Sequence, residues 1–380
     1  MAAGTPNNNN NFDEPGPVEL PVGKTVAKKW KIVEKLGEGG CGAVYLVEDT
    51  KSKARAALKA ESNFVAGGSV LKLEVQVLKR LAGRKYVAQL ITSGKKEKYC
   101  YMVMTLFGHS LARLFKFCKR EFTPSTQVRL GLQMLYGLKQ LHEVGYVHRD
   151  LKPANLAIGK KGKSARVVHL LDFGLSREYI IKVDGKTEIR KPRENTLFRG
   201  TTKYCSASAN HRGEQGRVDD LWSMVYVLAE MRGPLPWDQL RDKHEIGRIK
   251  KATPDEKLLA KSPAQLIDIA THLRELDYYK RPDYAKIYHI LDGIMVDLEV
   301  KHSDQFDWEK QPNYSQLSTE KKPSKGRKAK IITVSEDVSV ANKTAEGSAK
   351  GGKDPTVQSE ESEDKPPFNP AEFDKNEIGF

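Results

Sequence analysis

The stretch "YVHRDLKPANL", residues 146–156, constrains the fold more than any other part of the chain. It places a histidine, an arginine, an aspartate, a lysine and an asparagine within eight positions, between apolar residues typical of the edge of a core. Buried polar groups need hydrogen-bond partners, because leaving them unpaired is costly. The stretch therefore indicates either a functional loop held on a folded lobe or a satisfied polar knot in an unrelated core.

Structure is expected between residues 25 and 310. Residues 1–24 are rich in Asn, Pro and Gly, and residues 311–380 are rich in Lys, Ser, Glu and Gly. Both are predicted to be disordered, since they cannot bury enough apolar surface to offset the entropy of ordering. No run approaches the roughly 18 apolar residues of a membrane-spanning helix. The four cysteines lack the spacing of a zinc site or a disulfide framework. A cytoplasmic protein is the expectation, and the basic residues 321–330 leave nuclear import open.

The hydrophobic pattern changes along the chain and predicts an α+β fold with two lobes. Strand-like segments occupy residues 30–37, 43–50, 54–61, 86–94 and 98–106, with one helical segment at 69–83. From Thr123 the apolar spacing becomes helical, and two further helices are expected at 123–145 and 219–231. Residues 25–107 should form a small, mostly antiparallel sheet with one helix, and residues 108–310 a mainly helical lobe.

A glycine-rich hairpin follows the first predicted strand. "GEGGCGAV" fits the pattern G-x-G-x-x-G-x-V through Gly37, Gly39, Gly42 and Val44. Glycines at this spacing let a strand–turn–strand backbone lie close over phosphate groups. A plain turn is the alternative for the glycines alone. The next segment is strand-like, so a dinucleotide-binding fold, which requires a helix there, is not favoured.

A hairpin over phosphates demands two charged residues further along. A lysine on the next strand should reach the phosphates, and a glutamate on the following helix should hold that lysine. Lys59 in "AALKAE" and Glu74 in "LKLEVQVLK" stand at these places. Either residue alone would be read as a surface charge, so their position relative to the glycines carries the prediction.

The opening stretch then acquires a chemical interpretation. Asp150 would accept a hydrogen bond from a substrate hydroxyl, and Lys152 would neutralise charge on a transferring phosphoryl group. Asn155 would bind a metal ion, and Asp172 in "LLDFGLS" would be the second metal ligand. ATP as the phosphoryl donor and Mg²⁺ as the cofactor follow from this assignment.

With these residues in place the chain resembles a eukaryotic protein kinase of the casein kinase 1 superfamily, nearest to the tau-tubulin kinase branch. The resemblance covers about residues 28–310. It depends on "PRENTLFRGTTKY" (192–204), "GTTKYCSASANHRGEQGRVDDLWS" (200–223), "LPWDQL" (235–240), "RPDY" (281–284) and "FDWEK" (306–310).

The resemblance implies a Ser/Thr kinase whose ATP pocket is lined by Ala57, the gatekeeper Met104 and Leu106. It also implies that Lys152 and Thr201 form the substrate-loop pair. Enzymes of this superfamily favour acidic or already phosphorylated residues before the target. The resemblance assigns that anion to Lys203 and Arg241, with the backbone at Gly233.

Two departures from the family pattern concern the substrate loop. Most kinases have Ala-Pro-Glu where this chain has Ser206-Ala207-Ser208, and casein kinase 1 enzymes usually have Ser-Ile-Asn, so Ser208 stands in place of the usual asparagine. Arg281 would pair with the missing glutamate, so its partner is open. Asn210 replaces a usual histidine, which leaves the local packing open.

The body of the chain is basic. Residues 1–310 hold 53 Lys and Arg against 37 Asp and Glu. This field favours anionic partners, here acidic or phosphorylated protein substrates, although a merely soluble surface would look the same. The substrates could include cytoskeletal proteins, and the protein is expected to be a monomer. Nucleic acid is not favoured, because no zinc spacing or basic recognition helix is visible. The alternative is a pseudokinase scaffold that binds acidic partners, but Lys59, Asp150 and Asp172 are all present.

Overall fold

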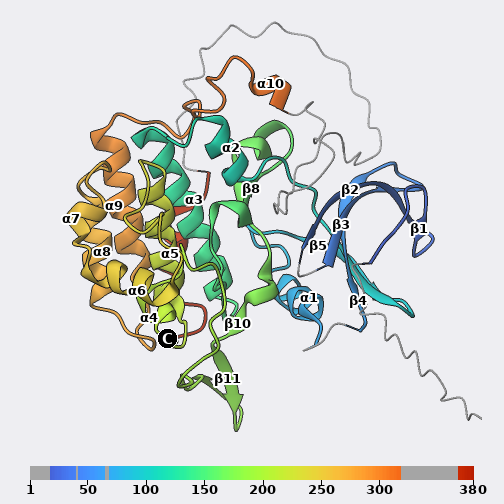
Figure 1. The fold of residues 1–380 in the computed structure, drawn as a ribbon, viewed down its shortest axis with the longest axis horizontal. Coiled ribbons are helices and arrows are strands. Elements are labelled where there is room, and N and C mark those ends of the chain that lie inside the picture. The colour runs from blue at the N-terminus through green and yellow to red at the C-terminus, as the bar shows by residue number, and fades with distance from the viewer. Residues whose placement is uncertain (1–17, 40–41, 65–67, 318–366) are drawn as a thin grey trace, which may run out of the picture.

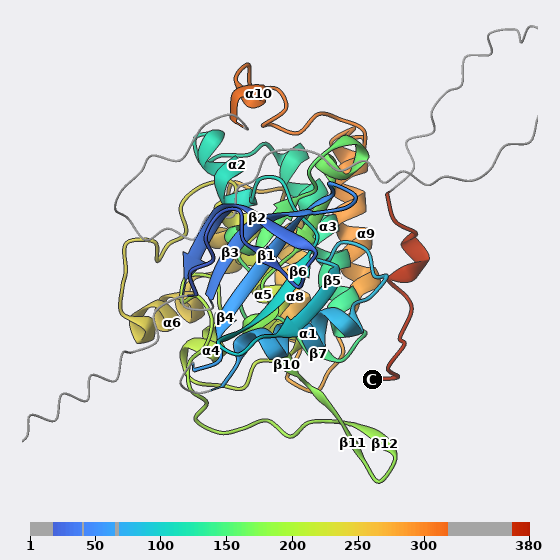
Figure 2. The same ribbon diagram turned by 90° about the vertical axis from the view of Figure 1, so that its right-hand side faces the viewer.

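The computed structural model describes residues 18–39, 42–64, 68–317 and 367–380. A twisted sheet with one helix forms one lobe, and a bundle of helices forms the other (Figure 1). The chain thus has the predicted α+β fold with an antiparallel sheet lobe and a helical lobe. Figure 2, turned by 90°, looks onto the sheet lobe with the helices behind it.

The sheet has six antiparallel strands in the order β1-β2-β3-β4-β6-β5. They are β1 (Thr25–Val26), β2 (Trp30–Gly39), β3 (Gly42–Asp49), β4 (Arg55–Ser62), β5 (Leu90–Lys95) and β6 (Tyr99–Met104). The strand predicted at 86–94 starts later than expected. Its first residues instead bond to the helical lobe, where Leu170 N donates to Tyr86 O (3.0 Å) and Ala88 N donates to Leu170 O (3.1 Å).

Alternation along β3 makes both faces of the sheet apolar. Val44 and Leu46 join the large core that continues into the helical lobe, whereas Tyr45 and Val47 join a smaller core on the outer face with Trp30. Successive strand residues point to opposite faces, so this pattern buries the sheet on both sides. The inner face is the one that looks onto the candidate site.

The helix in the described part of the sheet lobe, α1 (Val70–Arg80), carries a charged residue in its buried stripe. Ser69 caps the helix, and its Oγ accepts from Lys72 N (3.1 Å). The buried face consists of Leu71, Glu74, Val77 and Leu78. Glu74 therefore points inward with the apolar residues and needs a partner inside the protein.

The helical lobe is built around two long helices that were predicted from their apolar pattern. They are α3 (Pro124–His142), capped by Thr123, and α5 (Arg217–Glu230), which is buried almost throughout. The remaining helices are α2 (Leu111–Phe117), α4 (Ala207–Asn210), α6 (Lys243–Ala252), α7 (Asp255–Leu258), α8 (Leu266–Arg274), α9 (Tyr284–Asp297) and α10 (Tyr314–Leu317). No helix among the described residues is long and apolar enough to span a membrane.

Six short strands lie in the described part of the helical lobe. They are β7 (Tyr146–Val147), β8 (Leu156–Ile158), β9 (Val168–Leu170), β10 (Arg177–Glu178), β11 (Ile180–Val183) and β12 (Lys186–Ile189). The antiparallel pair β8–β9 places Leu156 opposite Leu170. Leu171 N donates to Asn155 O (2.9 Å), so the residue before β8 lies beside the residue after β9.

Three segments expected to be disordered are packed on the lobes. Residues 18–24 lie on the sheet, where Tyr45 donates its hydroxyl hydrogen to Val18 O (2.6 Å). Residues 311–317 contact α2, where Arg113 donates a hydrogen bond to Leu317 O. Residues 367–380 place two phenylalanines in the core. The average composition of the two predicted segments is polar, so it did not indicate these few apolar residues. They pack against the lobes only after the lobes have folded. The rest of the two predicted segments lies outside the described residues.

Candidate active site

A lysine, a glutamate and an aspartate from three separate elements meet where the lobes face each other. Lys59 on β4 lies with its Nζ 2.5 Å from Oε2 of Glu74 on α1 and 3.4 Å from Oδ1 of Asp172. Lys59 and Glu74 are buried, whereas the Asp172 side chain is 23% exposed. Burial raises the pKa of Glu74, and the Lys59 ammonium opposes that shift. The arrangement aims one ammonium at a partly open carboxylate.

The glycine-rich hairpin lies on β2 and β3, with Gly37, Gly39 and Gly42 in the described part. Gly42 has φ +99°, and a Cβ there would collide with the carbonyl of Ala60 on β4. Glycine at 42 is thus required for the close approach of neighbouring strands. Val44, Ala57, Met104 and Leu106 are buried in one common core, and Ala57 pairs directly with Met104 across β4 and β6.

Asp150 sits in a closed triangle of hydrogen bonds. Lys152 Nζ lies 2.6 Å from Asp150 Oδ2 and 2.8 Å from Thr201 Oγ1, and Thr201 donates to Asp150 Oδ1 (2.7 Å). Gly200, with φ +109°, brings the Thr201 loop against the backbone of Arg149, where a side chain would collide. The carboxylate is oriented from both sides, as a group that must receive a proton at a fixed point requires.

Asp220 on α5 anchors the loop that carries Asp150. The polar groups of this loop can lie at the edge of the core because Asp220 provides them with buried hydrogen-bond partners. Its carboxylate accepts from His148 N (2.6 Å), Arg149 N (2.8 Å) and His142 Nε2 (2.9 Å). Although burial raises the pKa of Asp220, these donors hold it below its ordinary value. No role for Asp220 was predicted from the sequence, although the doubled aspartate of "DDLWS" on an apolar helix was a signal for one.

Asn155 and Asp172 are held next to each other by the backbone. Asn155 Nδ2 donates to Asp150 O (2.9 Å) and Asp150 Oδ2 (3.2 Å). The Leu171–Asn155 hydrogen bond brings Asp172 alongside, and Asp172 adopts a left-handed φ of 64°. Among the described residues no cluster of three or more His, Cys, Asp or Glu side chains could hold a metal ion by itself. An amide and a carboxylate instead fit Mg²⁺, which commonly takes one or two protein ligands and completes its shell with phosphates and water.

Comparison with known proteins agrees with this geometry. Residues 30–290 match the family described as the protein kinase domain. This chain belongs to the protein kinase family.

The relatives of this kinase point to a particular branch. A Caenorhabditis elegans protein named as a serine/threonine-protein kinase is 48% identical over 315 residues, which cover 82% of this kinase and 91% of that protein. An inactive tau-tubulin kinase of the same organism is 34% identical over 249 residues (62% and 86%). Casein kinase I homolog 3 of Schizosaccharomyces pombe is 31% identical over 292 residues (74% and 66%). These names agree with the predicted casein kinase 1 and tau-tubulin kinase branch.

The residues predicted to bind a substrate anion are not equally available in this kinase. Lys203 Nζ lies 2.6 Å from Glu230 Oε1 and 2.7 Å from Asp238 Oδ1, so two carboxylates already neutralise it. Arg241 is exposed just before α6. Gly233 adopts φ +155°. An anion would therefore meet Arg241 without displacing those carboxylates, whereas Lys203 would have to be released from them.

Lys250 on α6 forms hydrogen bonds with the substrate loop. These bonds also show how Asn210 is packed, which the sequence left open. Its buried ammonium donates to Thr202 O (2.7 Å), Cys205 O (2.6 Å) and Asn210 Oδ1 (3.1 Å). Asn210 thus accepts a hydrogen bond where the family pattern has a histidine. Burial lowers the pKa of Lys250 to about 8.

Replacing Lys250 by methionine should change how stability depends on pH. The folded-state pKa lies below the unfolded value of 10.5, so the folded kinase binds fewer protons between pH 8 and 10.5. The free energy of unfolding of the wild type should therefore rise with pH in that window, by about 1 kcal/mol per pH unit relative to Lys250→Met. Urea unfolding at pH 7.5, 8.5 and 9.5 measures the difference, and parallel curves for the two proteins would refute it.

Arg281 has a partner other than the glutamate of most kinases. Its Nη2 lies 3.3 Å from Glu143 Oε1 at the end of α3 and donates to Lys375 O (2.7 Å). Glu143 is buried and also lies 3.3 Å from Lys139 Nζ. Arg281 thus forms an ion pair with Glu143 in place of the activation-segment glutamate of most kinases.

Proposed function

We propose that this kinase transfers the γ-phosphoryl group of Mg²⁺-bound ATP to serine and threonine hydroxyls of acidic or already phosphorylated proteins. The observation that carries the proposal is the joint arrangement of two charged groups. Lys59 is fixed by Glu74 and aimed at Asp172, and Asp150 is fixed by Lys152 and Thr201. The group around Lys59 can bind a nucleotide phosphate, and the group around Asp150 can bind a substrate hydroxyl.

On the acceptor side, Asp150 accepts the hydrogen bond of the substrate hydroxyl and takes its proton as the oxygen bonds to phosphorus. The bond from that phosphorus to the bridging oxygen of ADP breaks in the same transfer. Lys152, 2.6 Å from Asp150, offsets negative charge on the moving phosphoryl group. Fixed charges of this kind stabilise a transition state without reorganising when the reaction occurs.

On the nucleotide side, Lys59 contacts the nonreacting phosphates, and the backbone at Gly37, Gly39 and Gly42 covers them. Asn155 and Asp172 would hold Mg²⁺, which would supply positive charge to offset that of the phosphates. Ala57, Val44, Met104 and Leu106 form the apolar wall for the base. These residues come from both lobes, so the reacting groups are brought together by the fold itself.

The acidic-substrate preference is supported by the basic body and by Arg241, which is exposed and lies three residues after the Asp238 that pairs with Lys203 of the substrate loop. A screened charge contact at the protein surface contributes about 1 kcal/mol. Cytoskeletal proteins are candidate substrates, because the name of one relative, an inactive tau-tubulin kinase, refers to tubulin. Lys203 and the backbone at Gly233 are the proposed second part of the anion site.

Replacing Arg241 by alanine should raise KM for a serine peptide with an aspartate three positions upstream by about five-fold, with kcat unchanged, because one surface charge contact is lost. A peptide with alanine at that position should be unaffected. Initial rates over a range of peptide concentrations measure both. The matched control is Arg248→Ala, another exposed arginine, on α6. Equal KM changes for the two peptides would exclude Arg241 from anion recognition.

The alternative is a scaffold that binds partners without phosphoryl transfer. One relative is named an inactive kinase, which keeps this candidate open for a chain of the same family. In this kinase Lys59, Asp150 and Asp172 are present and engaged in the contacts described above. Transfer of labelled phosphate to serine or threonine distinguishes the two functions.

A further inference from the structure

A segment far along the sequence lies against the helical lobe on the side away from the substrate loop. We call residues 367–380, "PFNPAEFDKNEIGF", the return segment. It contains the short 3-10 turn Pro370–Glu372 and runs beside α3 and α9, as the red trace in Figure 2 shows. None of the hydrogen bonds and ion pairs described for its residues involves the proposed catalytic and nucleotide-binding side chains; Lys375 O accepts from Arg281, as described above.

Two phenylalanines anchor the return segment. Phe368 is 5% exposed and stacks on Tyr136 of α3, with ring centroids 5.2 Å apart. Phe373 is 1% exposed and stacks on Tyr288 of α9 at 4.6 Å. Tyr86 contacts Phe368 edge-on at 5.9 Å. Aromatic anchors in pockets of this kind dominate the binding energy of peptides and interfaces.

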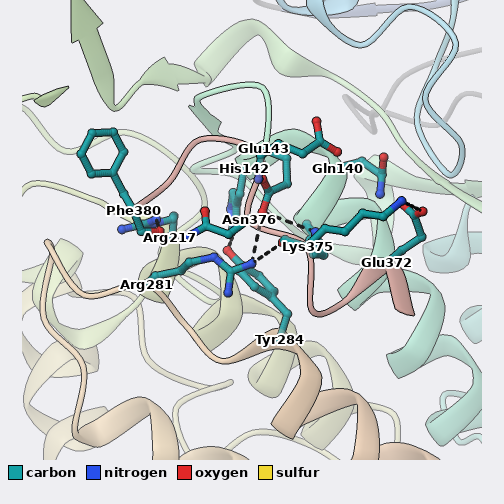
Figure 3. A network of polar contacts seen from close by, with 12 residues as sticks. Gln140, His142, Glu143, Arg217, Arg281, Tyr284, Glu372, Lys375, Asn376 and Phe380 are labelled. Atoms are coloured by element: carbon teal, nitrogen blue, oxygen red, sulfur yellow. Dashed lines mark hydrogen bonds and ion pairs between the residues drawn. The ribbon is translucent and has the colours of Figure 1, made fainter. Parts of the chain in front are cut away.

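A set of charges accompanies the anchors, and Figure 3 shows the part around Glu143 and Arg281. Arg84 forms an ion pair with Glu377, and this contact lowers the pKa of the Glu377 carboxyl. The backbone N–H of Glu377 donates to Glu143 Oε2 (2.6 Å). Arg281 donates to Lys375 O (2.7 Å). The return segment thus adds hydrogen bonds to the buried Glu143 and to its partly exposed partner Arg281.

The length of the chain between α10 and the return segment does not force the return segment into its position on the helical lobe. Residues 318–366 separate the return segment from α10, and an extended chain of that length spans roughly 160 Å. Such a reach exceeds the size of a lobe, so the segment is placed by its own contacts. A short segment held by two anchors and a few charges also has a low free energy of local opening compared with the global unfolding of the domain.

The contacts link two parts of the molecule. Arg84 and Tyr86 belong to the connection between α1 and β5, residues 81–89, whereas Tyr136, Glu143 and Tyr288 belong to the helical lobe. The connection follows directly on the helix that carries Glu74. The return segment therefore touches the exit of α1 and the helical lobe at the same time.

We propose that the groove between residues 84–86, α3 and α9 is a peptide-docking site for the pattern Phe-x4-Phe-x3-Glu. Its occupant is the return segment of the same chain. Docking fixes the α1–β5 connection on the helical lobe, and release uncovers the groove. The inference is independent of the proposed catalytic function, because it concerns binding on another face.

The first test uses the full chain and a labelled peptide of residues 367–380. In the variant Phe368→Ala/Phe373→Ala the groove is vacated, so the peptide should bind about 100-fold more tightly than to the wild type by fluorescence anisotropy. The control Phe64→Ala removes an exposed phenylalanine and should match the wild type. Equal binding to the double variant and the wild type, or no binding to the double variant, would overturn the proposal.

The second test does not depend on core substitutions. Arg84→Glu or Glu377→Arg alone should increase hydrogen exchange of residues 81–89 and 367–380 by about five-fold, and the charge-swapped double variant should restore protection. A double variant no better protected than the single ones overturns the pairing. Sedimentation over a range of concentrations should show a monomer. Protection that disappears on dilution together with a dimer would assign the groove to a second copy and reject docking within one chain.

Discussion

Asp150→Asn is expected to lower kcat about 1,000-fold while it changes the affinity for Mg²⁺-ATP less than about three-fold. Asparagine has the same shape and can still face Lys152 and Thr201, but its amide accepts no proton from the substrate hydroxyl. The nucleotide side of the site, at Lys59 and Asp172, is untouched. Isothermal titration with Mg²⁺-ATP and initial rates of phosphate transfer measure the two quantities on the same preparation.

The matched control is Asp268→Asn, an exposed aspartate on α8. It should leave both quantities unchanged. Turnover of Asp150→Asn within ten-fold of the wild type would show that Asp150 does not receive the proton. A parallel loss of nucleotide affinity would instead indicate a disturbed loop, because Asp150 also holds Asn155.

Lys59→Met is expected to destabilise the kinase by about 3 kcal/mol and to reduce transfer at least about 100-fold. The loss of stability follows from Glu74, which is 1% exposed and would lose the ammonium 2.5 Å away. The loss of transfer follows from the missing charge at the phosphates. Urea unfolding and the transfer assay measure the two effects.

A second substitution separates them. Lys59→Met/Glu74→Leu removes both charges and should recover most of the stability, since an apolar pair can replace a buried ion pair, yet it should stay inactive. Lys72→Met, on the exposed face of α1, serves as the control for losing a lysine. If the double variant were as unstable as the single one, the cost would not come from an unpaired Glu74.

The candidate site residues could be named from the sequence because each occurs in a short pattern whose order is informative, and their chemical roles remain predictions. Gly42, Lys59, Asp150 and Asp172 follow one another in the order that a nucleotide hairpin and a phosphoryl-transfer loop require. Apolar periodicity predicted α3 and α5 for the same local reason. The structure brings Lys59, Glu74 and Asp172 together as that order implied.

Contacts between distant parts of the chain could not be read from local patterns. Asp220 bonds to residues more than 70 positions earlier, and Lys250 reaches back to Asn210. The partner of Arg281 is Glu143, which no motif singles out. The return segment was predicted to be disordered, because Phe368 and Phe373 are diluted in a polar sequence and find apolar partners only on the folded lobe.

Phosphate transfer by the purified full chain tests most directly whether this protein is an active serine/threonine kinase. The kinase is incubated with ATP and an acidic protein such as casein, and phosphorylated residues are identified by mass spectrometry with and without a chelator of Mg²⁺. We expect phosphoserine and phosphothreonine that require Mg²⁺ and vanish in Asp172→Ala, which removes one of the two proposed metal ligands. Nucleotide binding without any transfer, or transfer that Asp172→Ala retains, would show that this arrangement is not a phosphoryl-transfer site.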